Sequence, residues 1–314
     1  MTQILETIFT VSFLAAALRL AVPLIFGTLG ELIGQRAGVM NLGIEGIMTA
    51  GAMAAWYTVY LGGDLYLGVI VAALVGSAFG WLHAQFAVRL GVSQHVSGIA
   101  ITLLATGLSY FFVVTALPHS ASGAKIVPFS VAEIPLLSKL PVLGPTLFSQ
   151  NVLGYIALLS VPAVAYVLFR TPIGLLIRMA GENPLAVEGE GVDVLRLRVG
   201  AVMAGSALMG IGGAYLSLAA FDTFIFGMVA GRGWVCIALV FFASWKPWRA
   251  LAGALMFAAF DALQLRQQQQ AFQVIPYQFF LAMPYMLSIA VLAITSRGLN
   301  YPRALFQPFR RGER

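Results

Sequence analysis

Nine apolar stretches dominate the chain, and most of them are close to the length of about 20 residues at which a helix spans a bilayer. Two stretches, 233–244 and 250–265, are shorter, as expected for tilted, broken or partly re-entrant helices. We predict an all-α, polytopic membrane protein, a single domain over residues 1–314 with about nine (8–10) transmembrane helices. The stretches are 8–33, 38–61, 65–88, 96–117, 151–169, 199–221, 233–244, 250–265 and 276–295.

Composition and motifs exclude most enzyme chemistry. Hydrophobic residues make up 60% of the chain and charged residues 10%, against about 25% charged in soluble domains. The single cysteine, Cys236, excludes an intrachain disulfide and a cysteine-based zinc site. The three histidines lack metal-ligand spacing, and no G-x-S-x-G or H-E-x-x-H motif occurs. We therefore expect no metal, no cofactor and no catalytic residue in this chain.

Small residues spaced four apart indicate how the helices pack. Gly46, Ala50 and Ala54 follow this spacing in the second stretch, and a similar series occurs in the sixth. Such stripes let two helix backbones approach closely. They indicate helix packing and carry no information about function.

The distribution of lysine and arginine predicts a cytoplasmic C-terminus, because positive charges near helix ends resist translocation. With that end inside, 13 of the 18 basic residues lie in the cytoplasm. The side of the N-terminus stays open, because Arg19 within the first stretch is compatible with a broken or interfacial segment. The 13 residues are Arg36, Arg89, Arg170, Arg178, Arg196, Arg198, Lys246, Arg249, Arg297, Arg303, Arg310, Arg311 and Arg314.

Two long connections and a basic tail lie outside the apolar stretches. Residues 118–150 are rich in proline, which predicts an ordered, extended extracytoplasmic loop, with a plain spacer as the alternative. Residues 171–198 form a mixed-charge cytoplasmic segment. Residues 297–314 form a basic cytoplasmic tail, and we expect its arginines to meet anionic membrane lipid at about 1 kcal/mol each rather than to bind nucleic acid.

Asn183 and Pro184 divide the mixed-charge segment. Proline sets its own φ at the first turn of a helix and disfavours helical backbone in the residue before it. The pair predicts a short helix from Pro184 to about Glu190, ended by Gly191, lying across the membrane face. A soluble partner could grip such a helix, and a solvated loop is the alternative.

Polar residues within or beside the apolar stretches indicate a transport pathway, because an ionised group at mid-bilayer costs several kcal/mol. Asn41 and Glu45 are four apart and are predicted to share a helix face. Neutral hydrogen-bonding groups suit a neutral, hydroxyl-rich solute. Pairing of Glu45 with Arg36 or Arg19 is the structural alternative. The candidate pathway residues are Asn41, Glu45, Gln94, Ser97, Thr102 and Thr106.

Five segments, in a chain region from about Leu14 to the C-terminal tail, resemble the permease subunits of ABC importers for simple sugars and nucleosides. Several long motifs in one order argue against coincidence. Within that family the chain most resembles the shorter of two permeases that work with a basic-membrane-lipoprotein type binding protein, the branch associated with nucleoside uptake. The segments are GELIGQRAGVMNLGIEGIMTAGA, QHVSGIAITLLATGLSYF, AGENPLAVEGEGVDVLRLR, GMVAGRGWVCIALVFFASWKPWRALAGALMFAAFDALQLRQQ and IPYQFFLAMPYMLSIAVLA.

This resemblance implies a division of labour among several proteins. A second permease, expected to be a distinct, longer paralogue, completes the pore in the bacterial plasma (inner) membrane. A cytoplasmic ABC ATPase binds ATP below, and an extracytoplasmic solute-binding lipoprotein delivers solute from above. The chain contains no G-x-x-x-x-G-K-[ST] phosphate loop of its own. The residues that match the family's ATPase-contact loop are Gly181, Glu182, Asn183, Pro184, Ala186, Val187 and Gly191.

An ion-coupled secondary transporter of a small polar solute is the alternative function. It would use Glu45 as a proton or sodium site. Its uptake would collapse with the ion gradient and survive loss of any ATPase. The sequence leaves open the choice among nucleosides, nucleobase-like compounds and simple sugars.

Overall fold

The computed structural model describes residues 10–116, 124–135, 137–269 and 301–309 and the single positions 286, 289 and 293; for 267–269 it describes the backbone alone. This part of the chain contains eleven α-helices, α2 to α12, and one two-stranded sheet. The all-α class is therefore confirmed.

The long helices coincide with eight of the nine predicted stretches, and the ninth, 276–295, lies outside the described residues apart from three positions. α4 continues into the π-helical turn η1 (Gln85–Arg89), and α10 continues into η3 (Leu216–Ala220). The helices are α2 (Val11–Arg36), α3 (Ile44–Tyr60), α4 (Leu65–Ala84), α5 (Gln94–Ala116), α7 (Val152–Arg170), α10 (Val194–Tyr215), α11 (Arg232–Phe242) and α12 (Pro247–Gln269).

Five of these helical segments are long and apolar enough to cross a membrane, so the chain is a polytopic membrane protein. Two thirds of the apolar window is buried in the segments that contain α2 and α10, but only 22–33% in the other three. α2 and α10 therefore form the centre of the bundle, and the remaining three expose one face. The segments are Val11–Arg36, Leu65–Arg89, Gln94–Thr115, Val152–Arg170 and Val194–Ala220.

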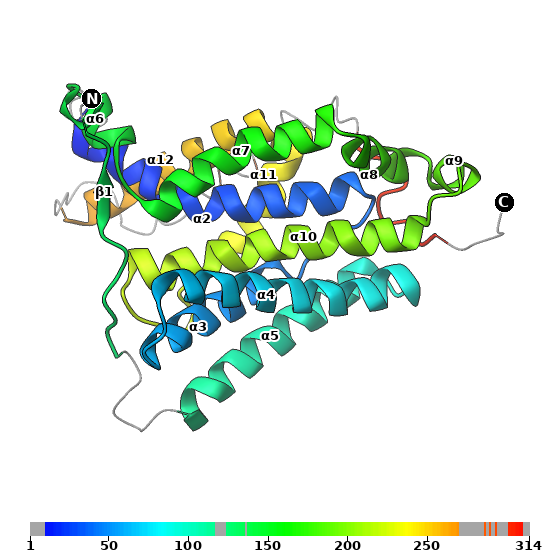
Figure 1. Cartoon of the computed structure of the whole chain (residues 1–314), viewed down its shortest axis with the longest axis horizontal. Coiled ribbons are helices and arrows are strands. Elements are labelled where there is room, and N and C mark those ends of the chain that lie inside the picture. The colour runs from blue at the N-terminus through cyan, green and yellow to red at the C-terminus, as the bar shows by residue number, and fades with distance from the viewer. Residues whose placement is uncertain are drawn as a thin grey trace.

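The bundle has two structurally different ends. α2 and α10 lie side by side, with α7 on one side and α3 and α4 on the other, while α5 diverges from the bundle (Figure 1). At one end, here called the sheet end, lie β1 (Val131–Glu133), η2 (Leu137–Lys139), α6 (Leu143–Leu147) and β2 (Ser149–Asn151). At the opposite end, here called the α9 end, lie α8 (Pro172–Glu182) and α9 (Pro184–Gly189).

One alternative for the first stretch is excluded, and the predicted start of the second helix is wrong. α2 is continuous through Arg19, so the first stretch is not broken at this residue. α3 begins at Ile44 rather than near residue 38, because Gly38 takes a φ of +88° after the end of α2. Residues 37–43 are consequently a non-helical connection, and Asn41 does not share a helix face with Glu45.

The predicted short helix in the mixed-charge segment is confirmed. α9 begins at Pro184 and ends at Gly189, and Gly191 follows with a φ of +79°. Asn183 caps α9 by accepting a hydrogen bond from the Ala186 amide at 3.2 Å. The Asn-Pro pair therefore both ends α8 and starts α9.

Glycine pairs hold the central helices in close contact. A Cβ built on Gly205 of α10 would lie 2.2 Å from the carbonyl oxygen of Gly30 in α2, and one on Gly30 would lie 2.3 Å from that of Gly205. A Cβ on Gly213 would lie 1.9 Å from the Met48 carbonyl oxygen of α3. The backbones touch at these points. Of the predicted stripe in the second stretch, Gly46 makes such a contact, since a Cβ there would lie 2.5 Å from the Thr102 Cα of α5.

We predict that Gly205→Ala lowers the apparent Tm of the protein in detergent, because overpacking at such a contact costs about 1–3 kcal/mol. Gly200→Ala is the matched control, since a Cβ at Gly200 on the same helix meets nothing within 4 Å. Thermal unfolding followed by size-exclusion chromatography measures both. Equal Tm values for the two variants would contradict this packing.

Candidate functional site

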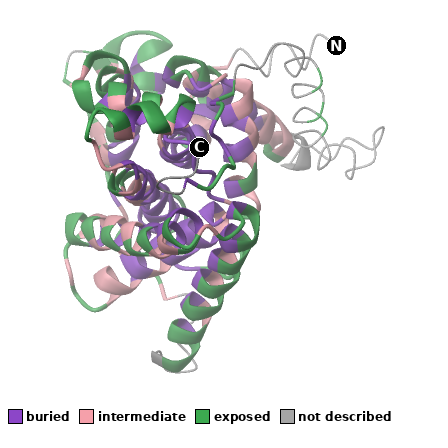
Figure 2. Ribbon diagram, turned by 90° about the vertical axis from the view of Figure 1, so that its right-hand side faces the viewer, coloured by how far each residue is buried: buried purple, intermediate pink, exposed green. Residues whose placement is uncertain are grey.

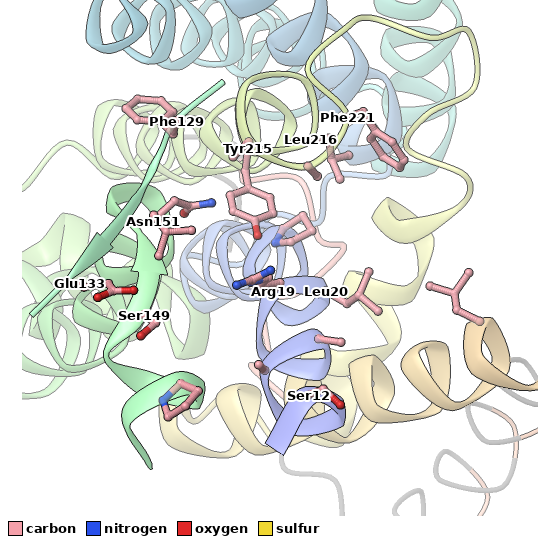
Figure 3. A pocket seen from close by; sticks show the side chains of 18 of the residues that line it. Ser12, Arg19, Leu20, Phe129, Glu133, Ser149, Asn151, Tyr215, Leu216 and Phe221 are labelled. Atoms are coloured by element: carbon pink, nitrogen blue, oxygen red, sulfur yellow. The ribbon is translucent and has the colours of Figure 1, made fainter. Parts of the chain in front are cut away.

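A cavity of about 1030 Å³ lies at the sheet end of the bundle (Figure 3). The N-terminal half of α2, the sheet and the C-terminal end of α10 form its walls. Several lining side chains are exposed, so the cavity communicates with the surface. The lining residues are Val11, Ser12, Ala15, Ala16, Arg19, Leu20, Pro23, Phe129, Val131, Glu133, Ser138, Pro145, Ser149, Asn151, Tyr215, Leu216, Ala219, Ala220, Phe221, Arg232 and Leu265.

Irregular backbone surrounds this cavity on two sides. Pro23 inside α2 has no N–H, so the carbonyl oxygen of Arg19 lacks its usual helical partner. On the facing wall, α10 widens into the π-helical turn η3 before it ends at Phe221. Such turns are frequent at functional sites, and irregular backbone at membrane depth is tolerated where it lines a cavity.

The cavity combines hydrogen-bonding groups with aromatic rings. Arg19 of α2, Asn151 of β2 and Tyr215 of α10 converge in the middle of Figure 3, although they are far apart in the sequence. The rings of Phe129 and Phe221 form apolar parts of the wall. A site of this kind suits a polar solute that presents both hydroxyl groups and a flat face.

Glu45 holds the start of α11. Its two carboxylate oxygens accept hydrogen bonds from the amides of Gly231 and Gly233, both at 2.8 Å. A carboxylate at a helix N-terminus satisfies free amides and complements the helix dipole. Gly233 leaves no room for a Cβ, which would lie 2.7 Å from a Glu45 oxygen. The residue between the two glycines, Arg232, lines the cavity.

The expected alternative of an ion pair between Glu45 and Arg36 or Arg19 is wrong. Arg36 instead donates two hydrogen bonds to the carbonyl oxygen of Trp245, at 3.0 and 3.2 Å. Arg19 lies in the wall of the cavity. Sequence reasoning could not find the true partners of Glu45, because they are backbone amides about 190 residues away in the chain.

The connection at residues 37–43 is held by buried side chains of the surrounding helices. Glu31 accepts a hydrogen bond from the Asn41 amide at 3.0 Å, and Gln94 accepts one from the Met40 amide at 2.8 Å. The Nε2 of His83 lies 3.0 Å from the Met40 carbonyl oxygen. Since a carbonyl only accepts, Nε2 carries the proton, and the other ring nitrogen of the neutral ring accepts from Ser97 at 3.0 Å.

Three of the six predicted pathway residues lie in this connection or bond to its backbone. Gln94 also donates to the Gly38 carbonyl oxygen at 3.3 Å, Thr102 donates to that of Leu42 at 2.9 Å, and Asn41 donates to the Ser206 hydroxyl at 3.2 Å. Thr106 is half-buried one turn further along α5. Among the described residues, none of the six predicted pathway residues lines the cavity.

Sequence reasoning missed the cavity residues and several members of the polar network. Arg19 and Pro23 gave a signal, since a charge and a proline four residues apart in an apolar stretch are unusual. Trp245 and Gln35 gave none, although the Trp245 Nε1–H donates to the Gln35 side-chain oxygen at 2.8 Å. The two residues are 210 positions apart.

The predicted contact residues lie at the α9 end. Glu182, Asn183 and Ala186 are exposed. Val187, on the inner face of α9, is 3% exposed and packs into a small buried cluster. Gly181 is buried against the end of α2, where a Cβ would lie 2.2 Å from the Arg36 carbonyl oxygen. The exposed helix α9 is therefore tied closely to a central helix of the bundle.

We predict that Glu45→Gln lowers the apparent Tm clearly more than Thr49→Val. Glutamine can accept from one glycine amide but turns its own NH₂ toward the other, and a hydrogen bond to a charged group contributes about 1.5–3 kcal/mol. Thr49 lies one turn away and donates only to the backbone carbonyl of Glu45, at 2.9 Å. A Tm of Glu45→Gln equal to that of the wild type would show that the carboxylate does not hold α11.

Sequence comparison with known proteins identifies the family of this chain. Residues 13–295 match the family model described as branched-chain amino acid transport system / permease component. The chain is 37% identical to a putative glucose ABC transporter permease of Haloferax volcanii, an alignment covering 96% of this chain and 98% of the relative. It is 33% identical to the guanosine ABC transporter permease of Bacillus subtilis, over 95% of this chain and 96% of that protein.

A third relative, the nucleoside ABC transporter permease of Lactococcus lactis subsp. cremoris, is 33% identical over 87% of this chain and 88% of its own length. No solved structure matches the chain. The chain therefore belongs to this permease family and is the membrane-spanning component of an ABC transport system, without an ATPase site of its own.

Proposed function

We propose that this chain, paired with a second and distinct, longer permease, forms the translocation pathway of an ATP-driven importer for nucleosides or related simple sugars. The observation that carries the proposal is the placement of a polar and aromatic cavity at one end of a bundle whose other end presents α9. Solute would enter at the sheet end, and ATP hydrolysis by the partner ATPase would drive movement at the α9 end.

The solute class follows from the cavity and the relatives together. The relatives are named for glucose, guanosine and nucleosides, all of them neutral and rich in hydroxyl groups. The cavity, at about 1030 Å³, has room for such a molecule, and its charged lining residues Arg19, Glu133 and Arg232 leave no large excess of one sign. Asn151 and Tyr215 offer neutral hydrogen bonds, and Phe129 and Phe221 offer flat faces.

The proposed topology places the sheet end outside the cell. The chain would cross a bacterial plasma membrane about nine times, with its C-terminus and the segment 171–198 in the cytoplasm and the loop 118–150 outside. A solute-binding lipoprotein would dock at the sheet end. A cytoplasmic ABC ATPase would grip the exposed residues of α8 and α9.

Direct contacts support a mechanical link from α9 to the cavity. Closing of the ATPase dimer would move α8 and α9, and the contact of Gly181 with the Arg36 backbone would pass that movement to α2. Arg198 of α10 donates to the Ala180 carbonyl oxygen of α8 at 3.0 Å and would pass it to α10. Both helices form walls of the cavity, so its access can alternate between the two sides.

We assign the predicted pathway residues to a gate between the cavity and the α9 end. Their hydrogen bonds hold the connection 37–43 and the start of α11 in the present arrangement. Solute passage requires these elements to part. The proposed gate residues are Asn41, Glu45, Gln94, Ser97, Thr102 and Thr106.

We predict that Glu182→Arg and Pro184→Ala each uncouple ATP hydrolysis from uptake. The first reverses the charge of an exposed contact residue, and the second removes the fixed φ with which α9 begins. The measurement is solute uptake per ATP hydrolysed in proteoliposomes that contain both permeases, the ATPase and the binding protein. Leu74→Ala, at an exposed position in the middle of α4 and away from both ends, is the control and should leave this ratio unchanged.

The same proteoliposomes separate the importer from an ion-coupled transporter. Uptake should require ATP and persist when ionophores dissipate ion gradients, and the chain alone should accumulate nothing. Concentrative uptake by the chain alone would overturn the proposed function. Direct binding of nucleosides and sugars to the cognate binding protein identifies the solute.

We predict that Ala220→Trp abolishes uptake while the transporter still assembles, because an indole at this exposed lining position fills part of the cavity. Ala78→Trp adds the same group at an exposed position of α4, away from the cavity, and serves as the matched control. Uptake by both variants at wild-type rates would remove the cavity from the solute's route.

A further inference from the structure

Residues 301–309, here called the C-terminal strap, fold back across the α9 end of the molecule. The Ala304 amide is hydrogen-bonded to Gly181 of α8, so the strap lies at the end of the bundle that faces the viewer in Figure 2. The sequence predicts a basic tail that meets lipid, but in this part of the tail Pro302, Ala304, Leu305 and Phe309 are buried. The strap is therefore part of the folded protein.

One side of the strap is bonded to the segment that carries α8 and α9. The Ala304 amide donates to the Gly181 carbonyl oxygen at 2.8 Å. Arg198, which is 1% exposed, donates to Ala180 of α8 at 3.0 Å and to Gln307 of the strap at 3.2 Å. Phe309 shares one buried cluster with Val187 of α9. The strap and α9 thus rest on the same small core.

The other side of the strap contacts the connections between the membrane helices. The ring of Phe306 stacks on His95 at the start of α5, with centroids 5.0 Å apart. A Cβ on Gly38 would lie 3.2 Å from the Ala304 carbonyl oxygen, and one on Gly91 would lie 3.6 Å from Pro308. The strap therefore bridges α8 and α9 to the α2–α3 connection and the α4–α5 turn.

The strap and the α8–α9 segment both present exposed apolar and charged side chains. Phe306 of the strap is 40% exposed and Leu185 of α9 is 48% exposed. Arg303 of the strap and Glu182 of α8 are also exposed, and the Arg303 amide donates to the Glu182 carboxylate at 3.5 Å. Apolar side chains with charged groups at the rim are typical of protein–protein interfaces.

We propose that the ATPase-docking surface is bipartite and that the C-terminal strap forms its second half beside α9. This inference rests on the proposed function, which gives α9 an ATPase partner. The occupant is the ATPase rather than lipid, because the strap and α9 share one buried cluster and exposed Arg303 of the strap is hydrogen-bonded to exposed Glu182 next to α9. An ATPase subunit that binds α9 would therefore also contact the strap.

Site-specific photocrosslinking in the assembled transporter tests this directly. A photoreactive phenylalanine analogue replaces Gln307 of the strap, Ala186 of α9, or Tyr66 at the sheet end as the control; all three side chains are exposed. The expected result is a crosslink to the ATPase from positions 307 and 186 and none from position 66.

The outcomes separate the two proposals. A crosslink from position 186 without one from 307, or a crosslink from 307 to lipid alone, overturns the bipartite surface and leaves the proposed function standing. Absence of an ATPase crosslink from both positions contradicts α9 as the contact helix and removes the basis of both proposals.

A second test measures solute transported per ATP hydrolysed in two variants, a ratio that reports coupling rather than assembly. Phe309→Ala removes the side chain that joins the strap to the Val187 cluster, and it should lower solute transported per ATP several-fold. Phe111→Ala removes an exposed aromatic side chain of α5, outside the strap, α8 and α9, and should have no effect. An unchanged ratio in Phe309→Ala, with normal complex assembly, would contradict a role of the strap in coupling.

Discussion

The structure depends on how its buried non-helical backbone is satisfied. Residues 37–41 are buried in protein and shielded from water, so this connection persists only where protein side chains bond its N–H and C=O groups. Glu31, His83, Gln94 and Thr102 supply these bonds from α2, α4 and α5. These polar residues are unusual in an apolar sequence, and they are explained by the hydrogen bonds that they make to backbone groups which would otherwise be unsatisfied.

The membrane helices could be predicted from the sequence, because length and hydropathy are local properties. α9 could be predicted for the same reason, since Asn183 and Pro184 set its start by their own backbone preferences. The partners of Glu45 could not, because they are amides of a segment about 190 residues away. The strap was also missed: its arginines suggest solvent or lipid, while the contacts of Ala304 and Phe309 arise only in the folded chain.

Two kinds of contact divide the bundle into parts with different freedom to move. Where backbones touch, as at Gly30 and Gly205 or at Gly213 and Met48, no sliding is possible without a clash. These contacts join α2, α3 and α10 into one unit. Where a side chain caps a distant helix, as Glu45 caps α11, two hydrogen bonds can exchange for water or solute at modest cost.

This division suits a permease that works by rocking. A rigid unit of α2, α3 and α10 can move as one body, so a displacement at the α9 end also displaces the cavity walls. Close-packed cores shift between discrete arrangements rather than deforming gradually. α11 has only 11 residues and is also packed closely against this unit, since a Cβ on Gly233 would lie 2.7 Å from the Glu45 backbone and one on Gly27 would lie 2.6 Å from Cys236 Sγ. Under the gate proposed above, a hydroxyl-rich solute would replace the bonds that the Glu45 carboxylate makes to the Gly231 and Gly233 amides.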